Sequence, residues 1–234
     1  MDLHIMLLPG LLSNANLFAE QVPALSTIAS VEVGDLTNDD TIGGMAASVL
    51  ETASAGRFVL LGLSLGGYVA FEIMRQAPER VTGLVLMDTT ARPDTEEARA
   101  ARETLIELAK TDLNAVTEKL LPRLSHPDKM SLPTVRGTIH SMAESLGMEV
   151  FERQQRAIMA RLDSLPTLAG IACRTLVICG EDDLVTPPAL SAEIRDGIKN
   201  AQLEIIHQCG HLSTLDQPQE VNRLLIEWIK NTNG

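Results

Sequence analysis

Apolar residues gather in short runs along this chain, and each run is followed by turn residues and a stretch with helical periodicity. The clearest runs are Leu3–Leu8, Phe58–Gly62, Leu84–Asp88, Thr175–Cys179 and Leu203–His207. A weaker run includes Val31 and Val33. Near-continuous apolar strands that alternate with helices are typical of a parallel sheet covered on both faces. The pattern therefore predicts an α/β fold with a mostly parallel sheet of about six strands.

Two stretches predict helices that pack on this sheet. Pro218 suits the first turn of a helix, and the apolar residues after it recur at helical spacing. These residues are Val221, Leu224, Leu225, Trp228 and Ile229. Residues 65–74 are instead apolar nearly all round, which indicates a helix buried in the middle of the molecule.

Between residues 91 and 169 the strand pattern stops and helical patterns dominate. This segment is too long for a simple crossover between two parallel strands. It also holds nearly equal numbers of acidic and basic residues, whereas the flanking segments are strongly acidic. We therefore predict an α/β core made of residues 1–90 and 170–234, with residues 91–169 inserted as a helical cap.

Composition and charge narrow the classes of function. The chain has 234 residues and a net charge of −12, which disfavours binding to nucleic acid or to an anionic membrane. Its three cysteines lack the spacing of a disulfide framework or a zinc site. The apolar run at the N-terminus is too short to span a bilayer and lacks the flanks of a signal peptide. We expect a cytoplasmic monomer or homodimer that acts on a small molecule without metal or cofactor.

The clearest candidate for chemistry is Ser64. It lies in Gly62-Leu63-Ser64-Leu65-Gly66, a G-x-S-x-G pattern directly after a predicted strand and at the start of a predicted helix. A nucleophilic serine needs such a tight turn to expose its oxygen, and the glycines allow strand and helix to approach closely. The context predicts a nucleophile at the carboxyl edge of the sheet.

A serine nucleophile needs a base, and His211 is the best placed of the five histidines. It follows the last strand run and precedes the last helix, at the sheet edge where sites of open α/β folds lie. His4 and His207 fall in or at the end of strand patterns, which suggests structural roles. His126 and His140 lie in the cap segment, where a solvated histidine is the usual case.

Three carboxylates compete for the role of the acid that orients this histidine. Asp88 ends a strand run, and Asp182 and Asp183 lie in the loop after Thr175–Cys179. All three are expected at the correct edge of the sheet. In the second loop we also expect Thr186 to cap the next helix, with Pro187 in its first turn.

Taken in order, four segments make the chain resemble the α/β-hydrolase superfamily. They are PGLLSNANLF, GLSLGG, GEDDLVTPP and CGHLSTLDQP. The likeness is greatest to small bacterial carboxylesterases, enol-lactonases and cofactor-free haloperoxidases. It implies Ser64, Asp183 and His211 as a catalytic triad, with the N–H groups of Leu11 and Leu65 as the oxyanion hole. The chain departs from the family in having Pro9 where a histidine is usual and in lacking two antiparallel edge strands.

The resemblance implies a serine hydrolase that cleaves carboxylic esters of small or medium apolar acyl groups through an acyl-enzyme. Lactones, thioesters, C–C bonds and perhydrolysis are the alternatives on the same triad. A ligand receptor built on a hydrolase scaffold is the alternative from another class. A serine at the elbow argues against dehalogenases and epoxide hydrolases of this fold, which would need an aspartate there.

The cap segment offers candidate substrate contacts. Phe151, Gln155, Ile158 and Leu162 are spaced to share one helical face, with Gln155 as a polar group on an apolar surface. Gln155 then either contacts the substrate or bonds to cap backbone. Met142 and Met159, with Phe151, either form a pliable substrate ceiling or fill the core of the cap.

Overall fold

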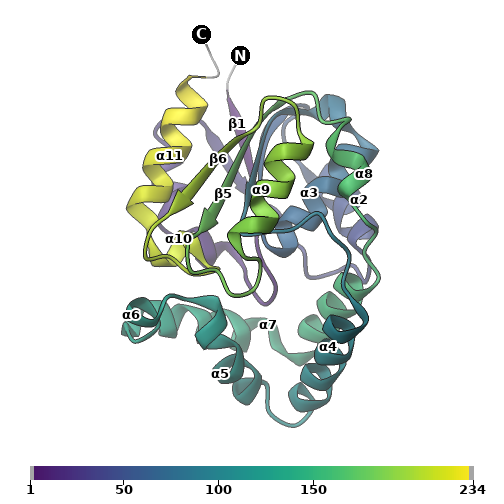
Figure 1. The fold of residues 1–234 in the computed structure, drawn as a ribbon, viewed down its shortest axis with the longest axis vertical. Coiled ribbons are helices and arrows are strands. Elements are labelled where there is room, and N and C mark those ends of the chain that lie inside the picture. The colour runs from purple at the N-terminus through teal and green to yellow at the C-terminus, as the bar shows by residue number, and fades with distance from the viewer. Residues whose placement is uncertain (1–2, 232–234) are drawn as a thin grey trace.

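Six parallel strands form a single sheet in the computed structural model, which describes residues 3–231 (Figure 1). The strand order is β2-β1-β3-β4-β5-β6, and all neighbouring pairs are parallel. The strands are β1 His4–Leu8, β2 Ser30–Val33, β3 Phe58–Leu63, β4 Val81–Met87, β5 Arg174–Gly180 and β6 Gln202–Ile206. This confirms the predicted sheet, including the weak run that forms β2.

Helices connect the strands and cover both faces of the sheet (Figure 1). Those of the N-terminal part are η1 Ala15–Phe18, α1 Gln21–Leu25, α2 Ile42–Thr52, α3 Leu65–Gln76 and η2 Pro78–Arg80. The middle of the chain forms α4 Glu96–Ala109, α5 Leu113–Leu124, α6 Pro127–Met130, α7 Pro133–Met159 and α8 Leu165–Leu168. The C-terminal part forms α9 Pro188–Gly197, α10 Ser213–Asp216 and α11 Pro218–Lys230.

Alternating residues of each strand enter two separate core clusters, because successive side chains of a strand point to opposite faces. Met6 and Leu8 of β1 pack with α2, α3 and α9 on one face. Ile5 and Leu7 pack with α1 and α11 on the other face. The helix after Pro218 is confirmed as α11, and its five predicted apolar residues are all buried.

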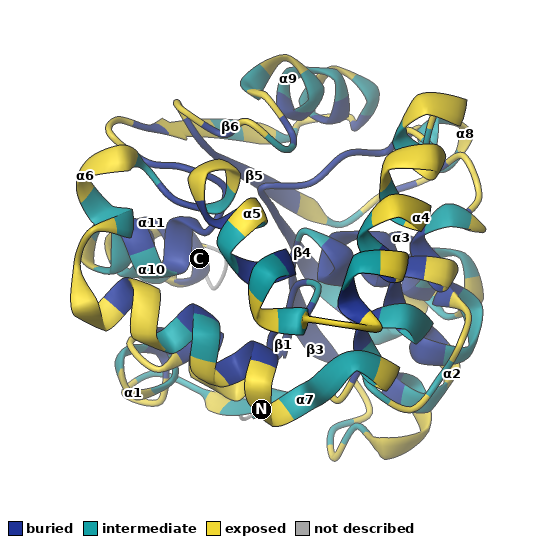
Figure 2. Cartoon of the chain, turned by 90° about the horizontal axis from the view of Figure 1, so that it is seen from below, coloured by how far each residue is buried: buried dark blue, intermediate teal, exposed yellow. Residues whose placement is uncertain are grey.

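The helices α4 to α7 lie beyond the carboxyl ends of the strands, so they cover the edge where the candidate chemistry was predicted (Figure 1). Of these helices, α4, α5 and α7 share a third apolar cluster with Leu12 of the loop after β1. Seen from this side, exposed residues follow the outer surfaces of α4, α5 and α7 (Figure 2). By contrast, α8 contacts α3 and α9. No helix of the described residues is long and apolar enough to cross a membrane.

One detail of the predicted cap face is wrong. The helix α7 ends at Met159, so Leu162 does not continue the face of Phe151 and Gln155. Leu162 lies on the surface with 65% of its area exposed. The same helix also breaks at Gly147, where φ is +78° and ψ is 177°. Helical spacing continued from Phe151 to Leu162 therefore places Leu162 incorrectly.

Candidate active site

Ser64 occupies a sharp turn between β3 and α3. Its backbone has φ +54° and ψ −111°, a region that a serine adopts only under strain. The turn requires glycine on both sides. A Cβ added to Gly62 would lie 2.3 Å from the Gly66 carbonyl oxygen, and one added to Gly66 would lie 2.1 Å from the Leu8 carbonyl oxygen. The turn holds the serine side chain at the carboxyl edge of the sheet.

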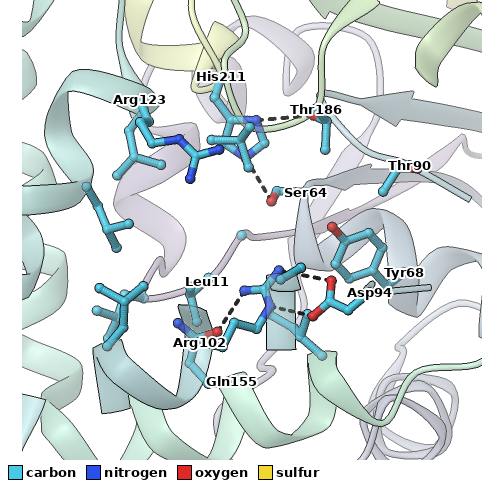
Figure 3. A pocket seen from close by; sticks show the side chains of 18 of the residues that line it. Leu11, Ser64, Tyr68, Thr90, Asp94, Arg102, Arg123, Gln155, Thr186 and His211 are labelled. Carbon is cyan, nitrogen blue, oxygen red and sulfur yellow. Dashed lines mark hydrogen bonds and ion pairs between the residues drawn. The ribbon is translucent and has the colours of Figure 1, made fainter. Parts of the chain in front are cut away.

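His211 lies opposite this serine, on the loop between β6 and α10. Its Nε2 atom is 2.9 Å from Ser64 Oγ, and only 2% of its side chain is exposed (Figure 3). The loop is fastened to the cap, because the Leu212 N–H donates to the Leu124 carbonyl oxygen at 2.8 Å. A second anchor is the buried Asp216, whose Oδ2 accepts the N–H groups of Gly210 and His126, each at 2.8 Å. Sequence reasoning missed Asp216.

Asp183 meets the other nitrogen of the imidazole. Its Oδ2 lies 2.9 Å from His211 Nδ1 and accepts the Thr186 hydroxyl at 2.7 Å. Its Oδ1 accepts the N–H groups of Val185 and Thr186 at 2.7 and 2.8 Å. The expectation that Thr186 caps the next helix is therefore wrong. Pro187 holds the cap position of α9 and makes no side-chain bond there, while Thr186 positions the carboxylate.

The two partners stabilise each other's charged forms. Burial alone would raise the pKa of Asp183, but the charge of His211 and the hydrogen bonds from His211 and Thr186 outweigh it and hold this pKa below its usual value. Burial alone would lower the pKa of His211, but the charge and hydrogen bond of Asp183, with the charge of Asp88, raise it above its usual value. The pair is therefore prepared to accept a proton on the imidazole.

These shifts predict the pH dependence of the reaction. His211, the predicted base, can accept a proton only when neutral, so kcat/KM should fall as the pH drops through its raised pKa, above the ordinary 6.5. Because Asp88 contributes to this rise, Asp88→Asn should move the acid limb of the profile to lower pH. Asp182→Asn is the matched control and should leave the limb in place. An unchanged limb in Asp88→Asn would contradict the electrostatic assignment.

The competing carboxylates lie elsewhere. Asp88 is fully buried and accepts the N–H groups of Gly180 and Ser213 at 2.9 and 3.3 Å. Burial and the nearby charge of Asp183 raise the pKa of Asp88 to about 7. The Asp182 side chain is 46% exposed and lies 3.6 Å from His126 Nε2. The structure therefore brings Asp183, and neither of the other two, to the imidazole of His211.

The other histidines form surface or cap contacts. His207 Nδ1 lies 2.9 Å from Glu181 on the protein surface, and His140 Nε2 lies 2.8 Å from Glu118 in the cap. His4 lies in β1, as its strand pattern indicated.

Three buried groups are close enough to suggest a metal site. Ligand atoms of Asp88, Cys179 and Asp183 lie within 4.8 Å of one another. Both carboxylates are already occupied by hydrogen bonds, as described above. Burial raises the pKa of the Cys179 thiol, which donates to the Gly180 carbonyl oxygen at 3.3 Å. A protonated thiol and two carboxylates that already accept hydrogen bonds do not suit a cation. We therefore assign these groups a supporting role for the loop between β5 and α9, which carries Asp183.

The predicted oxyanion donors lie next to Ser64 and His211. Within residues 3–231, the N–H groups of Leu11 and Leu65 have no hydrogen-bond acceptor. The left-handed residue of the first loop is Leu12, with φ +50°. The Leu12 N–H donates at 2.9 Å to Oε1 of the buried Gln154, whose Nε2 donates at 3.1 Å to the Leu36 carbonyl oxygen. Gln154 of the cap therefore holds the loop after β1 in place.

The proposed oxyanion role of Leu11 can be tested by removing its N–H group. Leu11→Pro should lower kcat by about 10²–10³-fold, the usual cost of one lost oxyanion donor. Leu11→Val is the matched control, because it changes the side chain and keeps the N–H. Steady-state kcat for both folded variants is the measurement. Equal kcat values would assign the oxyanion to another backbone group.

A cavity of about 460 Å³ opens over Ser64 and His211, between the sheet edge and the cap (Figure 3). Apolar side chains of the cap form one part of its wall, among them Leu105, Leu120, Leu124, Ile139 and Met142. A polar part contains Asp94, Arg102, Gln155 and Arg161. The cavity is large enough for a small organic molecule whose reacting carbon lies at the serine.

The four candidate cap contacts divide into two groups. Met142 and Gln155 line the cavity, and both are buried. Phe151 and Met159 belong to the apolar cluster inside the cap and are not among the residues that line the cavity.

Comparison with known proteins identifies a family and several solved structures that the chain resembles. A family described as "Alpha/beta hydrolase family" matches residues 11–224. A thermophilic esterase from Thermogutta terrifontis, solved with malate bound, is 28% identical with a TM-score of 0.92, over 100% of this chain and 92% of that one. The enol-lactonase from Burkholderia xenovorans is 24% identical with a TM-score of 0.88, over 98% and 92%. A Mycobacterium tuberculosis protein described by the words "non-heme bromoperoxidase BpoC" is 27% identical over 218 residues, 88% of this chain and 81% of the relative.

Proposed function

The chain belongs to the α/β-hydrolase family and is an esterase-like hydrolase of small molecules, and we propose that it cleaves carboxylic esters of small or medium apolar acyl groups. One observation carries the proposal. The Ser64 hydroxyl, on a strained turn, lies 2.9 Å from an imidazole that is itself 2.9 Å from an ionised carboxylate, under a largely apolar ceiling. Likeness to an esterase that is 28% identical supports the same reaction.

The reaction proceeds in two acyl-transfer steps. Ser64 Oγ attacks the ester carbonyl carbon while His211 Nε2 takes the hydroxyl proton, and the N–H groups of Leu11 and Leu65 bind the negative carbonyl oxygen. His211 then gives its proton to the leaving alcohol, and the acyl group remains on Ser64. In the second step His211 takes a proton from water, whose oxygen attacks the acyl carbon. The proton returns to Ser64, and the acid leaves.

Asp183 supports both steps without exchanging a proton. Its Oδ2 accepts a hydrogen bond from His211 Nδ1, which keeps Nε2 unprotonated and directed at Ser64 in the resting enzyme. Its negative charge then stabilises the imidazolium that forms in each step.

Covalent labelling of Ser64 tests the nucleophile. A fluorophosphonate probe should label the wild-type chain at Ser64 and should not label Ser64→Ala. Hydrolysis of a panel of esters, thioesters, lactones and vinylogous diketones, with Ser64→Ala as blank, then tests the substrate class. Fastest turnover on another bond type would replace the ester by that bond. A chain that stops after about one turnover on every substrate would instead be a receptor.

The cavity wall predicts which cap residue controls acyl length. Met142→Ala enlarges the cavity beside its apolar part, so kcat/KM for an octanoate ester relative to an acetate ester should rise about tenfold, since one methylene in such a pocket changes rates by that order. Met159→Ala is the matched control, because the Met159 side chain packs, partly buried, against the apolar cluster of the cap and does not line the cavity. Equal changes in both variants would indicate that Met142 only fills the core.

A further inference from the structure

The charge of the cavity wall is opposite to that of the chain. The chain carries a net charge of −12, yet within residues 3–231 the cavity is lined by four arginines and one carboxylate. These residues are Arg92, Arg102, Arg123, Arg161 and Asp94. A cleft lined with one sign of charge concentrates ligands of the opposite sign, even where the outer surface repels them. The wall therefore favours an anion.

Two of these arginines are committed to the protein itself. Arg92 donates two hydrogen bonds to Glu193, at 2.8 and 2.7 Å, on the exposed side of the wall. The Arg161 side chain is buried and donates to the carbonyl oxygens of Arg92 and Ile158. Its guanidinium also lies over the Tyr68 ring, 4.3 Å from the ring centroid. Both arginines therefore serve mainly to hold the wall together.

Asp94 does not neutralise the remaining charge. Its Oδ2 accepts from Arg102 Nε at 2.6 Å, and its Oδ1 accepts from Arg161 Nη1 at 2.7 Å. Burial opposes ionisation, but these two arginines outweigh it and hold the pKa of Asp94 below its usual value. One carboxylate therefore faces two guanidinium groups, and the cluster keeps a net positive charge.

Arg102 and Gln155 line the cavity and have unused donors, of which the Gln155 amide nitrogen is buried. Arg102 Nη1 donates to Gln155 Oε1 at 2.7 Å and Nη2 donates to Asp94 Oδ1 at 3.5 Å, which leaves one further N–H group on each terminal nitrogen. Gln155 is fully buried, and because its oxygen accepts from Arg102, its amide nitrogen is the free end. Within the described residues this Nε2 has no acceptor. In Figure 3 the pair lies across Ser64 from His211.

Resting on the proposed function, we propose that Arg102 and Gln155 bind a carboxylate of the substrate, so the preferred substrate is an acidic ester. A carboxylate offers acceptors and no donors, and its two oxygens match the planar N–H groups of a guanidinium. It would balance the positive charge around Asp94, and a modest shift of the Gln155 side chain would give the amide N–H an acceptor. The scissile ester carbonyl then lies at Ser64, with the free carboxylate at the other end of the molecule.

The carboxylate belongs either to the acyl part or to the alcohol part of the ester, and paired substrates distinguish the two. Monomethyl glutarate carries it on the acyl part and is compared with methyl hexanoate. The 3-acetoxypropanoate anion carries it on the alcohol part and is compared with butyl acetate. In the wild-type enzyme, kcat/KM for one anionic ester should exceed that of its neutral partner by about 10–100-fold. This ratio corresponds to the usual free energy of a hydrogen bond to a charged group.

The variant Arg102→Gln should lower this ratio by about tenfold or more, since it removes the charge. Arg99→Gln is the matched control, because Arg99 is exposed on the same helix, and it should keep the ratio. If circular dichroism shows that Arg102→Gln does not fold, Gln155→Met takes its place and should lower the ratio as well. Equal rates on anionic and neutral esters in the wild type, or a ratio that survives these substitutions, would overturn the subsite.

Failure of the subsite and failure of the ester activity give different results. Ser64-dependent hydrolysis of both members of a pair at equal rates removes the subsite and keeps the esterase. If neither ester is cleaved, while calorimetry shows monomethyl glutarate binding to the wild type and not to Arg102→Gln, the subsite stands and the ester activity is wrong.

Discussion

Ser64→Ala is expected to lower kcat on an activated ester by roughly 10⁶-fold, the loss seen when a serine nucleophile of a triad is removed. Alanine cannot form the acyl-enzyme, so the remaining rate comes from the oxyanion groups and from binding alone. The fold should survive, because alanine meets the same backbone strain at φ +54° as the serine it replaces. Melting temperature and kcat, measured on the same preparation, separate the two effects.

The matched control for this loss is Ser145→Ala. Ser145 lies in the cap, where its hydroxyl donates to the Met142 carbonyl oxygen and accepts from Asn14. Its replacement should keep kcat within about twofold, as expected for a surface change away from the site. A Ser64→Ala enzyme that retained a tenth of the wild-type kcat would place the nucleophile on another residue.

Much of the fold follows from short apolar runs and from apolar residues that recur with a period of 3.6. The strand runs and the stripe after Pro218 lie in the sheet and in α11, because the burial of apolar residues decides both. The glycines around Ser64 were equally informative, since any larger residue would overlap the backbone of α3 or β1. In each case the sequence pattern reflects a packing requirement, either the burial of apolar side chains or the lack of space for a side chain.

Side-chain partnerships in the cap were harder to predict. Asp94, Arg102 and Arg161 meet although 67 positions separate the first from the last. Such contacts depend on how the helices cross, and helical periodicity does not determine this. The same holds for Gln154, whose bond to Leu12 joins two elements 142 residues apart. The signal for Gln155 was its place on an otherwise apolar helical face, and no such signal pointed to Gln154.

The sequence positions of Asp88, Asp182 and Asp183 did not decide which of them orients His211. In the structure their contacts differ. Asp88 is a buried acid whose pKa is raised to about 7, and its two carboxylate oxygens accept the backbone N–H groups of Gly180 and Ser213. Asp182 is half-exposed and faces His126. We expect Asp88→Asn and Asp182→Asn each to lower kcat by less than about tenfold at pH 8, since neither carboxylate bonds to His211.

Asp183→Asn should instead lower kcat by about 10⁴-fold while the fold is kept. The backbone N–H groups of Val185 and Thr186 point at Oδ1, so the amide oxygen of an asparagine will occupy that position. Its NH₂ group must then face His211 Nδ1 and donate to it, which leaves the imidazole proton on Nε2. In that tautomer Nε2 cannot accept the Ser64 proton. The measurement is kcat for Asp183→Asn, Asp88→Asn and Asp182→Asn on one activated ester, with circular dichroism to confirm folding. If Asp88→Asn lost most of its kcat while Asp183→Asn kept nearly all of it, Asp88, which follows β4, would be the catalytic acid instead.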